Sequence, residues 1–266
     1  MLAKQANEII KCGDSFPYFC ENYVKFLHPT KGYLNFKLQP WQARLASALE
    51  ENRFVISKKW RQSGISTTHL MYCLWMCLFK EKKNVMWVHR TKREAEDFGE
   101  IFNLALRLLP DWMRPRMTRN SKYEKTFSTT ESNIIFTIPQ VARSRSVTHL
   151  VIDEAAYIPR MEWHWKAMWP LLSTGGRCWI NSTVNHGNNG YWFTELYLGA
   201  LKNTNCFHVF ESDYTENPDF QNPEYVKAMK DALGKEGWEI EVLGLLFPSM
   251  QPATIEVEGD PTKVQG

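Results

Sequence analysis

Apolar residues along the chain gather in short continuous runs, separated by segments with the apolar spacing of helices. Because the runs are rich in β-branched and aromatic residues and do not alternate with polar ones, they predict strands buried on both faces. This pattern indicates an α/β fold with a mainly parallel central sheet flanked by helices. The expected strands span residues 53–57, 84–88, 134–138, 149–153 and 177–182, with 206–210 as a candidate sixth.

Segments with helical spacing lie before and between these strands. Pro40 suits the first turn of one helix, and Pro110 ends another. Residues 110–133 are polar and basic without a regular pattern, so we expect irregular structure there. The expected helices span residues 16–27, 41–51, 66–80 and 91–109.

Composition limits the kind of protein this is. The chain has 266 residues, 44% hydrophobic and 23% charged, which is a globular mixture and excludes disorder, collagen or a coiled coil as the main architecture. The longest apolar run, residues 70–79, is about half the length that a membrane helix needs. Residues 248–266 are rich in proline and acids, which predicts a linker or tail. The six cysteines form no C-x2-C pair, which argues against a zinc ribbon and fits a reducing compartment.

Positive charge is concentrated in two segments. Residues 80–93 carry a net charge of +5 and residues 114–125 carry +4, although the whole chain carries only +3. Such concentrations suit a polyanion such as nucleic acid, and the alternative is a solvated lysine-rich surface. The basic candidates in the second segment are Arg114, Arg116, Arg119, Lys122 and Lys125.

The expected strand–loop–helix at 53–80 resembles a phosphate-binding loop. In G-x-x-x-x-G-K-[ST], backbone N–H groups surround the phosphates, the lysine neutralises them and the hydroxyl binds Mg²⁺. Here Gly64 and Ser66 fill the second glycine and hydroxyl positions, but Lys59 replaces the first glycine and Ile65 replaces the lysine. We expect Lys59 to supply the missing cation. The alternative is an ordinary turn between strand and helix.

A second candidate site follows the expected strand at 149–153. Asp153 and Glu154 come directly after four apolar residues. The first carboxylate can hold Mg²⁺, and the second can polarise a water that attacks a phosphate. The alternative is that the pair caps the next helix. Together with the loop, this pair predicts hydrolysis of a nucleoside triphosphate.

These motifs resemble those of phage large terminase subunits. Residues 59–66, Lys-x-Arg-Gln-x-Gly-Ile-Ser, are similar to their deviant Walker A, and residues 151–156 are similar to their Walker B with its catalytic glutamate. Residues 181–187 resemble the coupling motif, and residues 38–42 resemble the adenine-contacting glutamine motif. The resemblance implies a P-loop ATPase of the additional-strand catalytic-glutamate type, which uses ATP and Mg²⁺.

The resemblance also assigns roles within the loop. Lys59 and Arg61 would hold the β- and γ-phosphates, Gly64 would let the backbone approach them, and Ser66 with Asp153 would bind Mg²⁺. A plainer interpretation, such as a helix cap or a surface charge, stands beside each role. The other loop residues expected to contact the nucleotide are Gln62, Ser63, Ile65 and Thr67.

Outside the loop, the resemblance makes Glu154 the group that orients and deprotonates the attacking water. Gln42 would contact adenine, and Thr183 would contact the γ-phosphate and couple it to movement. Arg143, preferred slightly over Arg145, would reach the nucleotide of a neighbouring subunit. A surface glutamine, a polar turn and a surface arginine are the plainer alternatives for Gln42, Thr183 and Arg143.

The implied function is a motor subunit that translocates double-stranded viral DNA into a procapsid, as a homo-oligomeric ring. Its partners would be DNA, the portal protein and the small terminase subunit, and it would act in the host cytoplasm, docked on the procapsid. The ATPase domain would span 1–247, with a helical lead-in over 1–51. Family members usually add a nuclease domain, which we expect to be absent here and either separate or removed.

Two departures and two rival functions accompany this resemblance. Val184 stands where the coupling motif usually has proline, which leaves the conformation of that loop open. The first rival is a helicase-like DNA translocase, because residues 153–156 also resemble a D-E-A-x box. The second is a nucleotide-binding interaction module without turnover.

Overall fold

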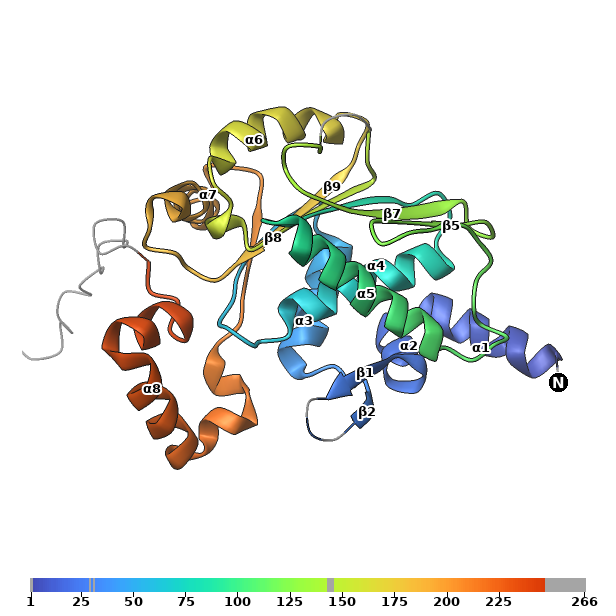
Figure 1. Cartoon of the computed structure of the whole chain (residues 1–266), viewed down its shortest axis with the longest axis horizontal. Coiled ribbons are helices and arrows are strands. Elements are labelled where there is room, and N and C mark those ends of the chain that lie inside the picture. Colours follow the sequence, from blue (N-terminus) through green and yellow to red (C-terminus); the bar gives the residue numbers. More distant parts are fainter. Residues whose placement is uncertain (1, 29, 31, 143–145, 247–266) are drawn as a thin grey trace, which may run out of the picture.

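The computed structural model describes residues 2–28, 30, 32–142 and 146–246, and its centre is an eight-stranded sheet (Figure 1). The strands lie in the order β10-β3-β9-β8-β4-β7-β6-β5. The first six run parallel, whereas β6 and β5 continue the sheet antiparallel, so the expected α/β class is confirmed. The bounds are β3 (Phe54–Lys58), β4 (Asn84–Val88), β5 (Met117–Asn120), β6 (Glu124–Phe127), β7 (Ser132–Thr137), β8 (His149–Asp153), β9 (Arg177–Ser182) and β10 (His208–Glu211).

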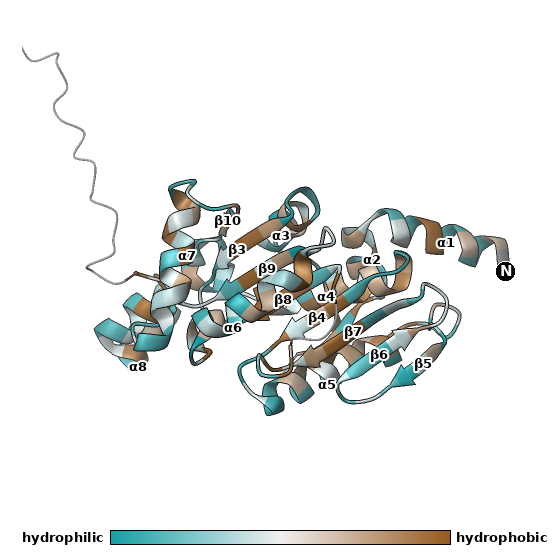
Figure 2. Cartoon of the chain, turned by 90° about the horizontal axis from the view of Figure 1, so that it is seen from above, coloured by the Kyte–Doolittle hydropathy of each residue, from teal (hydrophilic) through white to brown (hydrophobic). Residues whose placement is uncertain are grey.

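Each face of the sheet has its own hydrophobic core, and Figure 2 shows hydrophobic residues along the central strands. Val55 and Trp87 belong to the core that α1–α5 cover, and Ile56 and Met86 belong to the core under α6 and α7. Neighbouring residues enter opposite cores because a strand is pleated. No described helix has an apolar stretch that could cross a membrane. The helices are α1 (Leu2–Asp14), α2 (Phe16–Tyr23), α3 (Pro40–Glu51), α4 (Ile65–Phe79), α5 (Lys92–Leu108), α6 (Met161–Met168), α7 (Tyr191–Leu201) and α8 (Pro223–Glu241).

The helix expected over residues 16–27 is too long by four residues. α2 ends at Tyr23, and the chain turns into a hairpin of β1 (Lys25–His28) with β2 (Gly32–Asn35). Phe26 packs edge-on against Phe36, with ring centroids 5.9 Å apart. Pairing with a segment beyond the turn therefore overrides the helical spacing of these residues.

Residues 110–133 are not irregular, as the sequence suggested, because they form β5 and β6. Along β6 the side chains alternate between half-buried and buried, with Lys125 and Phe127 on the buried side. An antiparallel strand at the side of a sheet covers the core with one face only, so it lacks a continuous apolar run.

The basic segment 80–93 is divided by the sheet. Lys80 and Lys83 precede β4, whereas Arg90 and Arg93 follow it. Five residues of strand separate the two groups, which is about 17 Å at roughly 3.3 Å per residue. The segment therefore forms two clusters at opposite edges of the sheet, not one patch.

The same topology brings the carboxyl ends of β3, β9, β8 and β4 to one edge. Lys58 of β3 lies opposite Ser182 of β9, and Asn181 lies opposite Asp153 of β8. Ligands of parallel α/β sheets bind at this edge. The loop from 59 to 64 and the acidic pair after β8 thus meet, although they are far apart in the sequence.

Candidate nucleotide-binding site

The loop between β3 and α4 has a conformation that requires a glycine. Gln62 and Gly64 have φ values of 64° and 73°, in the left-handed region. A Cβ atom added to Gly64 would lie 2.3 Å from Gln42 Nε2. Trp41 Nε1 and Gln42 Nε2 both donate to the carbonyl oxygen of Ser63, at 2.9 and 3.3 Å. Two side chains at the start of α3 therefore hold the turn in place by hydrogen bonds to its backbone.

The loop and the first turn of α4 enclose a cavity of about 390 Å³, which we call the loop cavity. α4 begins at Ile65, so its first backbone N–H groups have no partner within the helix and carry partial positive charge. Such a helix terminus binds phosphate groups. The lining residues are 59–67 of the loop and helix, together with Glu154 and Thr183.

A buried lysine links the loop to the acidic pair. Lys59 Nζ donates to Ser66 Oγ at 2.7 Å and lies 3.0 Å from Asp153 Oδ1 and 2.9 Å from Glu154 Oε1. Ser66 Oγ in turn donates to Asp153 Oδ1 at 3.0 Å. One ammonium group therefore contacts all three groups that the sequence assigned to Mg²⁺ and to the attacking water.

Charge attraction outweighs burial for both partners of this ion pair. Burial lowers the pKa of Lys59, but the charges of Asp153 and Glu154 raise it further, so the net shift is upward. Burial raises the pKa of Asp153, but the charge of Lys59 holds it below its ordinary value. The two groups are therefore charged at neutral pH.

Glu154 occupies a position from which it can act on a water in the loop cavity. Its backbone is left-handed, with φ at 49°, and its side chain remains 36% exposed. Oε2 accepts from the backbone N–H of Thr183 at 3.4 Å and from Ser182 Oγ at 3.5 Å. The carboxylate thus touches the end of β9 and also lines the cavity.

Comparison with solved structures decides the fold. The structure is similar to the ATPase domain of the Thermus phage P74-26 large terminase, with a TM-score of 0.58 and 20% identity, over 79% of this chain and 94% of that one. It is also similar to the large terminase of bacteriophage HK97, with a TM-score of 0.68 and 12% identity, over 88% of this chain and 55% of that one. The chain has the fold of phage large terminase ATPase domains.

A third similar structure is a large terminase from a thermophilic bacteriophage in complex with ADP. Its TM-score is 0.59 at 15% identity, over 78% of this chain and 53% of that one. The chain thus spans about half the length of two of these large terminases. No protein-family model matches the sequence.

Within this terminase ATPase fold, the residues present fit Mg²⁺. Mg²⁺ prefers oxygen ligands, and it is usually held by one or two protein groups together with substrate phosphates and water. Ser66 Oγ and Asp153 Oδ1 provide two such oxygens, 3.0 Å apart. A cation position exists here, because the Lys59 ammonium group already contacts both atoms.

Sequence reasoning missed Asn181 as a candidate site residue. Its side-chain amide donates to Asp153 Oδ1 from the neighbouring strand, and the residue is fully buried. Asn181 therefore orients the carboxylate that is assigned to the metal. The sequence did hold a signal for Asn181: it is a polar residue near the end of a buried strand, and that strand neighbours the one that carries Asp153.

Two predicted ligands have other partners in this structure. Arg61 forms a two-pronged ion pair with Glu241 of α8, at 2.7 and 2.8 Å, and its side chain is 57% exposed. Gln42 is buried behind the loop and does not line the loop cavity. Their roles toward phosphate and adenine stay predictions. Arg143 and Arg145 lie outside the described residues.

Most of the basic residues in 114–125 that were candidates for DNA contact are buried or form ion pairs within the chain. Lys125 is fully buried, and burial lowers its pKa, so it cannot contact DNA in this conformation. Arg114, Arg119 and Lys122 form ion pairs with Asp111, Glu124 and Glu96, respectively.

Proposed function

We propose that this chain is the ATPase motor of a large terminase, which hydrolyses Mg-ATP to translocate double-stranded viral DNA into a procapsid. The observation that carries the proposal is the contact of Lys59 with Ser66, Asp153 and Glu154 beside the loop cavity. A carboxylate for the metal, a second for the water and a cation for phosphates are the parts that phosphoryl transfer needs. The similar structures in complex with ADP and with ATP-gamma-S support a nucleotide as the ligand.

In the proposed mechanism, the phosphates bind to the backbone N–H groups at the start of α4. Ser66 and Asp153 would hold Mg²⁺, which would neutralise charge on the transferred phosphoryl group. Lys59 would then move from the carboxylates to the β- and γ-phosphates. Its departure leaves Glu154 free to orient a water and accept its proton.

Thr183 would connect this chemistry to movement. Its backbone N–H contacts the Glu154 carboxylate, and its hydroxyl lies 3.3 Å from the hydroxyl of Tyr157. A γ-phosphate that binds or leaves beside Glu154 would therefore change the contacts of Thr183 at the end of β9. Arg143 is proposed to complete the site of a neighbouring subunit in a homo-oligomeric ring.

The wider assignments belong to the same proposal. Residues 1–247 would form the ATPase domain, and 248–266 a linker or tail. The portal protein, the small terminase subunit and DNA would be its partners, at the procapsid in the host cytoplasm. Any DNA cleavage would come from a separate nuclease domain or chain.

Glu154→Gln tests the enzymatic part of this proposal. The amide keeps the shape of the side chain but cannot accept the proton, so we expect ATP turnover to fall by at least 10²-fold, in line with the usual contribution of a general base. ADP affinity should change by less than about threefold, since Glu154 does not hold the phosphates. The measurements are phosphate release and equilibrium ADP binding.

Equal turnover of wild type and Glu154→Gln would contradict the proposed role of Glu154. A wild-type chain that binds ATP without turnover would instead favour a nucleotide-binding module. Stimulation of turnover by double-stranded DNA of any sequence, weakening with salt, is expected of a packaging motor.

A further inference from the structure

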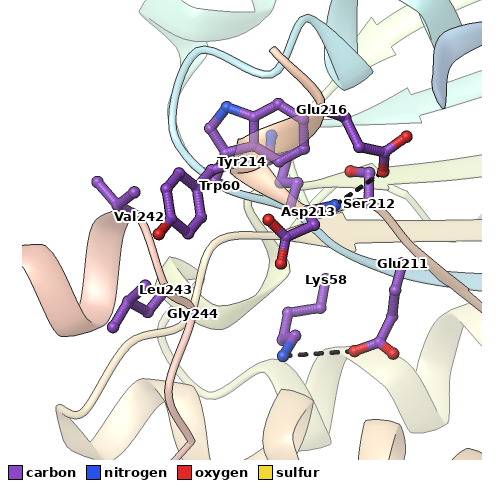
Figure 3. A pocket seen from close by; sticks show the side chains of 11 residues that line it. Lys58, Trp60, Glu211, Ser212, Asp213, Tyr214, Glu216, Val242, Leu243 and Gly244 are labelled. Atoms are coloured by element: carbon purple, nitrogen blue, oxygen red, sulfur yellow. Dashed lines mark hydrogen bonds and ion pairs between the residues drawn. The ribbon is translucent and has the colours of Figure 1, made fainter. Parts of the chain in front are cut away.

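Cavities lie at both edges of the sheet, and they differ in whether their polar groups have partners. At the carboxyl edge, the acids that line the cavity in Figure 3 are engaged: Glu211 and Glu216 form ion pairs, and Asp213 caps the turn at 214–216. At the amino edge, residues of α3, α4, β8 and β9 line a cavity of about 160 Å³, which we call the amino-edge cavity. Several polar groups of this second cavity have no partner among the described residues.

Three neighbouring parallel strands bring polar residues to the amino-edge cavity. Lys83 precedes β4, His149 begins β8 and Arg177 begins β9, and the last two lie opposite each other in the sheet. Lys80, which follows α4, adds a second ammonium group. Glu50 is the one acidic residue of the lining, so three cations stand against one carboxylate. The balance of charge therefore suits a small anion.

Two of these cations keep N–H groups that no described residue uses. Arg177 Nη1 donates to three carbonyl oxygens at the end of α3, at 3.0, 3.0 and 3.1 Å, whereas its Nε and Nη2 donate to none in the described part of the chain. Lys83 is half-buried, and its ammonium group forms no hydrogen bond or ion pair with a described residue. Lys80, by contrast, donates to the carbonyl oxygen of Gly13 at 3.0 Å. Arg177 and Lys83 thus have donors available for an anion.

A buried tyrosine hydroxyl also lacks a partner in this cavity. Tyr72 is 4% exposed, and its hydroxyl forms no hydrogen bond with any described residue. Burial and the charge of Glu50 raise the pKa of Tyr72, whereas the charge of Arg177 lowers it, which places the hydroxyl near both groups. A buried hydroxyl without a partner is unfavourable, so we expect a bound molecule to satisfy it.

His149 adds a requirement for a hydrogen-bond donor. The residue is 6% exposed, and burial together with the charges of Lys83 and Arg177 lowers its pKa to about 3, so the ring is neutral at pH 7. The Thr148 hydroxyl lies 2.9 Å from Nδ1 and donates its own hydrogen to the carbonyl oxygen of Asn84 at 3.0 Å, so Nδ1 carries the ring hydrogen. Nε2 is then an acceptor, and no described residue donates to it.

We propose that the amino-edge cavity binds hydrogen phosphate, with Lys83, Arg177 and Tyr72 donating to its oxygens and its own P–OH group donating to the histidine Nε2. Inorganic phosphate keeps at least one proton at neutral pH, whereas sulfate and the phosphodiesters of nucleic acid keep none. The volume is about half of the roughly 300 Å³ at which small-molecule sites begin, which favours the free ion over an ester. The site lies at the opposite edge of the sheet from the loop cavity and does not depend on the proposed function.

The test measures binding of inorganic phosphate, sulfate and glycerol 3-phosphate to the full chain by calorimetry, without nucleotide. Wild type should bind phosphate about tenfold more tightly than sulfate, because sulfate leaves Nε2 without a donor. His149→Phe should remove this preference by weakening phosphate alone. Tyr72→Phe and Lys83→Met should weaken both ions by about tenfold, since these groups donate to either anion.

A neighbouring lysine provides the matched control. Lys82→Met removes the same charge from the adjacent exposed position, outside the cavity, and should leave both affinities unchanged. Thermal unfolding should confirm that all variants are folded. Glycerol 3-phosphate distinguishes the source of the phosphate group: weaker binding than inorganic phosphate supports the free ion, and tighter binding supports a phosphate monoester in the same site.

Equal affinity of wild type for phosphate and sulfate would overturn the inference, because Nε2 would then accept nothing from the ligand. Phosphate binding that is unchanged in Lys83→Met and Tyr72→Phe would overturn it as well, since the ion would lie elsewhere, for example in the loop cavity. Equal losses in Lys82→Met and Lys83→Met would show attraction to surface charge in place of a defined site, which also contradicts the proposal.

Discussion

At the scale of single residues, the site depends on one ammonium group. Lys59 Nζ contacts Ser66, Asp153 and Glu154, and it is buried with Asp153. A buried carboxylate without a cation or hydrogen-bond donors is strongly unfavourable, so removal of one partner costs more than the pair contributes. Lys59 therefore stabilises this part of the fold, in addition to its proposed contact with phosphates.

Lys59→Met tests both roles, because methionine keeps most of the apolar stem. We expect ATP turnover to be lost and not restored by adding Ile65→Lys. The free energy of unfolding should fall by about 3 kcal/mol at pH 7, as expected when one partner of a buried ion pair is removed. Urea unfolding and phosphate release measure the two effects.

The loss of stability in Lys59→Met should depend on pH. The pKa of Asp153 is lowered from its ordinary value of 3.8, so its stabilising contribution is present above about pH 4 and is lost as the pH falls through the lowered value. The pKa of Lys59 is raised above 10.5, so the lysine keeps its charge up to that pH. The difference between wild type and variant should therefore be largest near neutral pH and shrink toward pH 3, where Asp153 becomes protonated.

A neighbouring lysine provides the control for this experiment. Lys58 pairs with Glu211 at 3.4 Å near the surface, where ion pairs contribute less than about 1 kcal/mol. Lys58→Met should thus have a small effect on unfolding. A loss as large as that of Lys59→Met would contradict the special position of Lys59.

Asn181→Leu tests the residue that orients Asp153. The substitution removes the amide donor at similar volume, and we expect a loss of about 1–3 kcal/mol in unfolding free energy, because a buried acceptor loses a partner. Titration with Mg²⁺ in the presence of ADP should show weaker metal dependence of ADP binding. Ser57→Ala is the matched control, since Ser57 lies opposite Asn181 in the sheet and its hydroxyl has no partner among the described residues. An unchanged metal titration would contradict the role.

At the scale of elements, hydrogen bonds join the start of α3 to the loop. The side chains of Trp41 and Gln42 at the start of α3 hold the carbonyl of Ser63, so the turn that enters α4 has little freedom. A loop that is formed before the ligand arrives loses less conformational entropy on binding. The geometry of the helix N-terminus is thereby set by a segment that comes before β3.

Gly64→Ala tests this arrangement. The new Cβ would force Gln42 away from Ser63 and would hold alanine at φ 73°, so we expect a loss of stability of more than about 1 kcal/mol and weaker ADP binding. Gly175→Ala has the same kind of backbone strain, at φ 94°, with no atom within 4 Å, and separates strain from the clash. Adding Gln42→Ala to Gly64→Ala should restore the part of the stability loss that the clash with Gln42 causes. Equal losses for Gly64→Ala and Gly175→Ala would contradict the close contact.

At the scale of the whole molecule, the sequence predicted the parallel part of the sheet well. Strands 84–88 and 149–153 have the expected bounds because buried parallel strands are apolar throughout. β5 and β6 were missed because one of their faces is polar, and the end of α2 was wrong because β1 forms only by pairing with β2. Asn181 was missed because its role depends on a contact between strands: its partner Asp153 lies 28 residues away on another strand.

The pairing of Lys59 with buried Asp153 has a consequence for how the protein folds and is stored. Because Lys59 neutralises buried Asp153 from within the chain, we expect the folded state not to depend on a bound metal or nucleotide. Newly synthesised or chelator-treated protein should thus retain its fold and remain ready for loading. A nucleotide that binds as proposed would first have to break these contacts, which would lower its apparent affinity and favour rapid exchange.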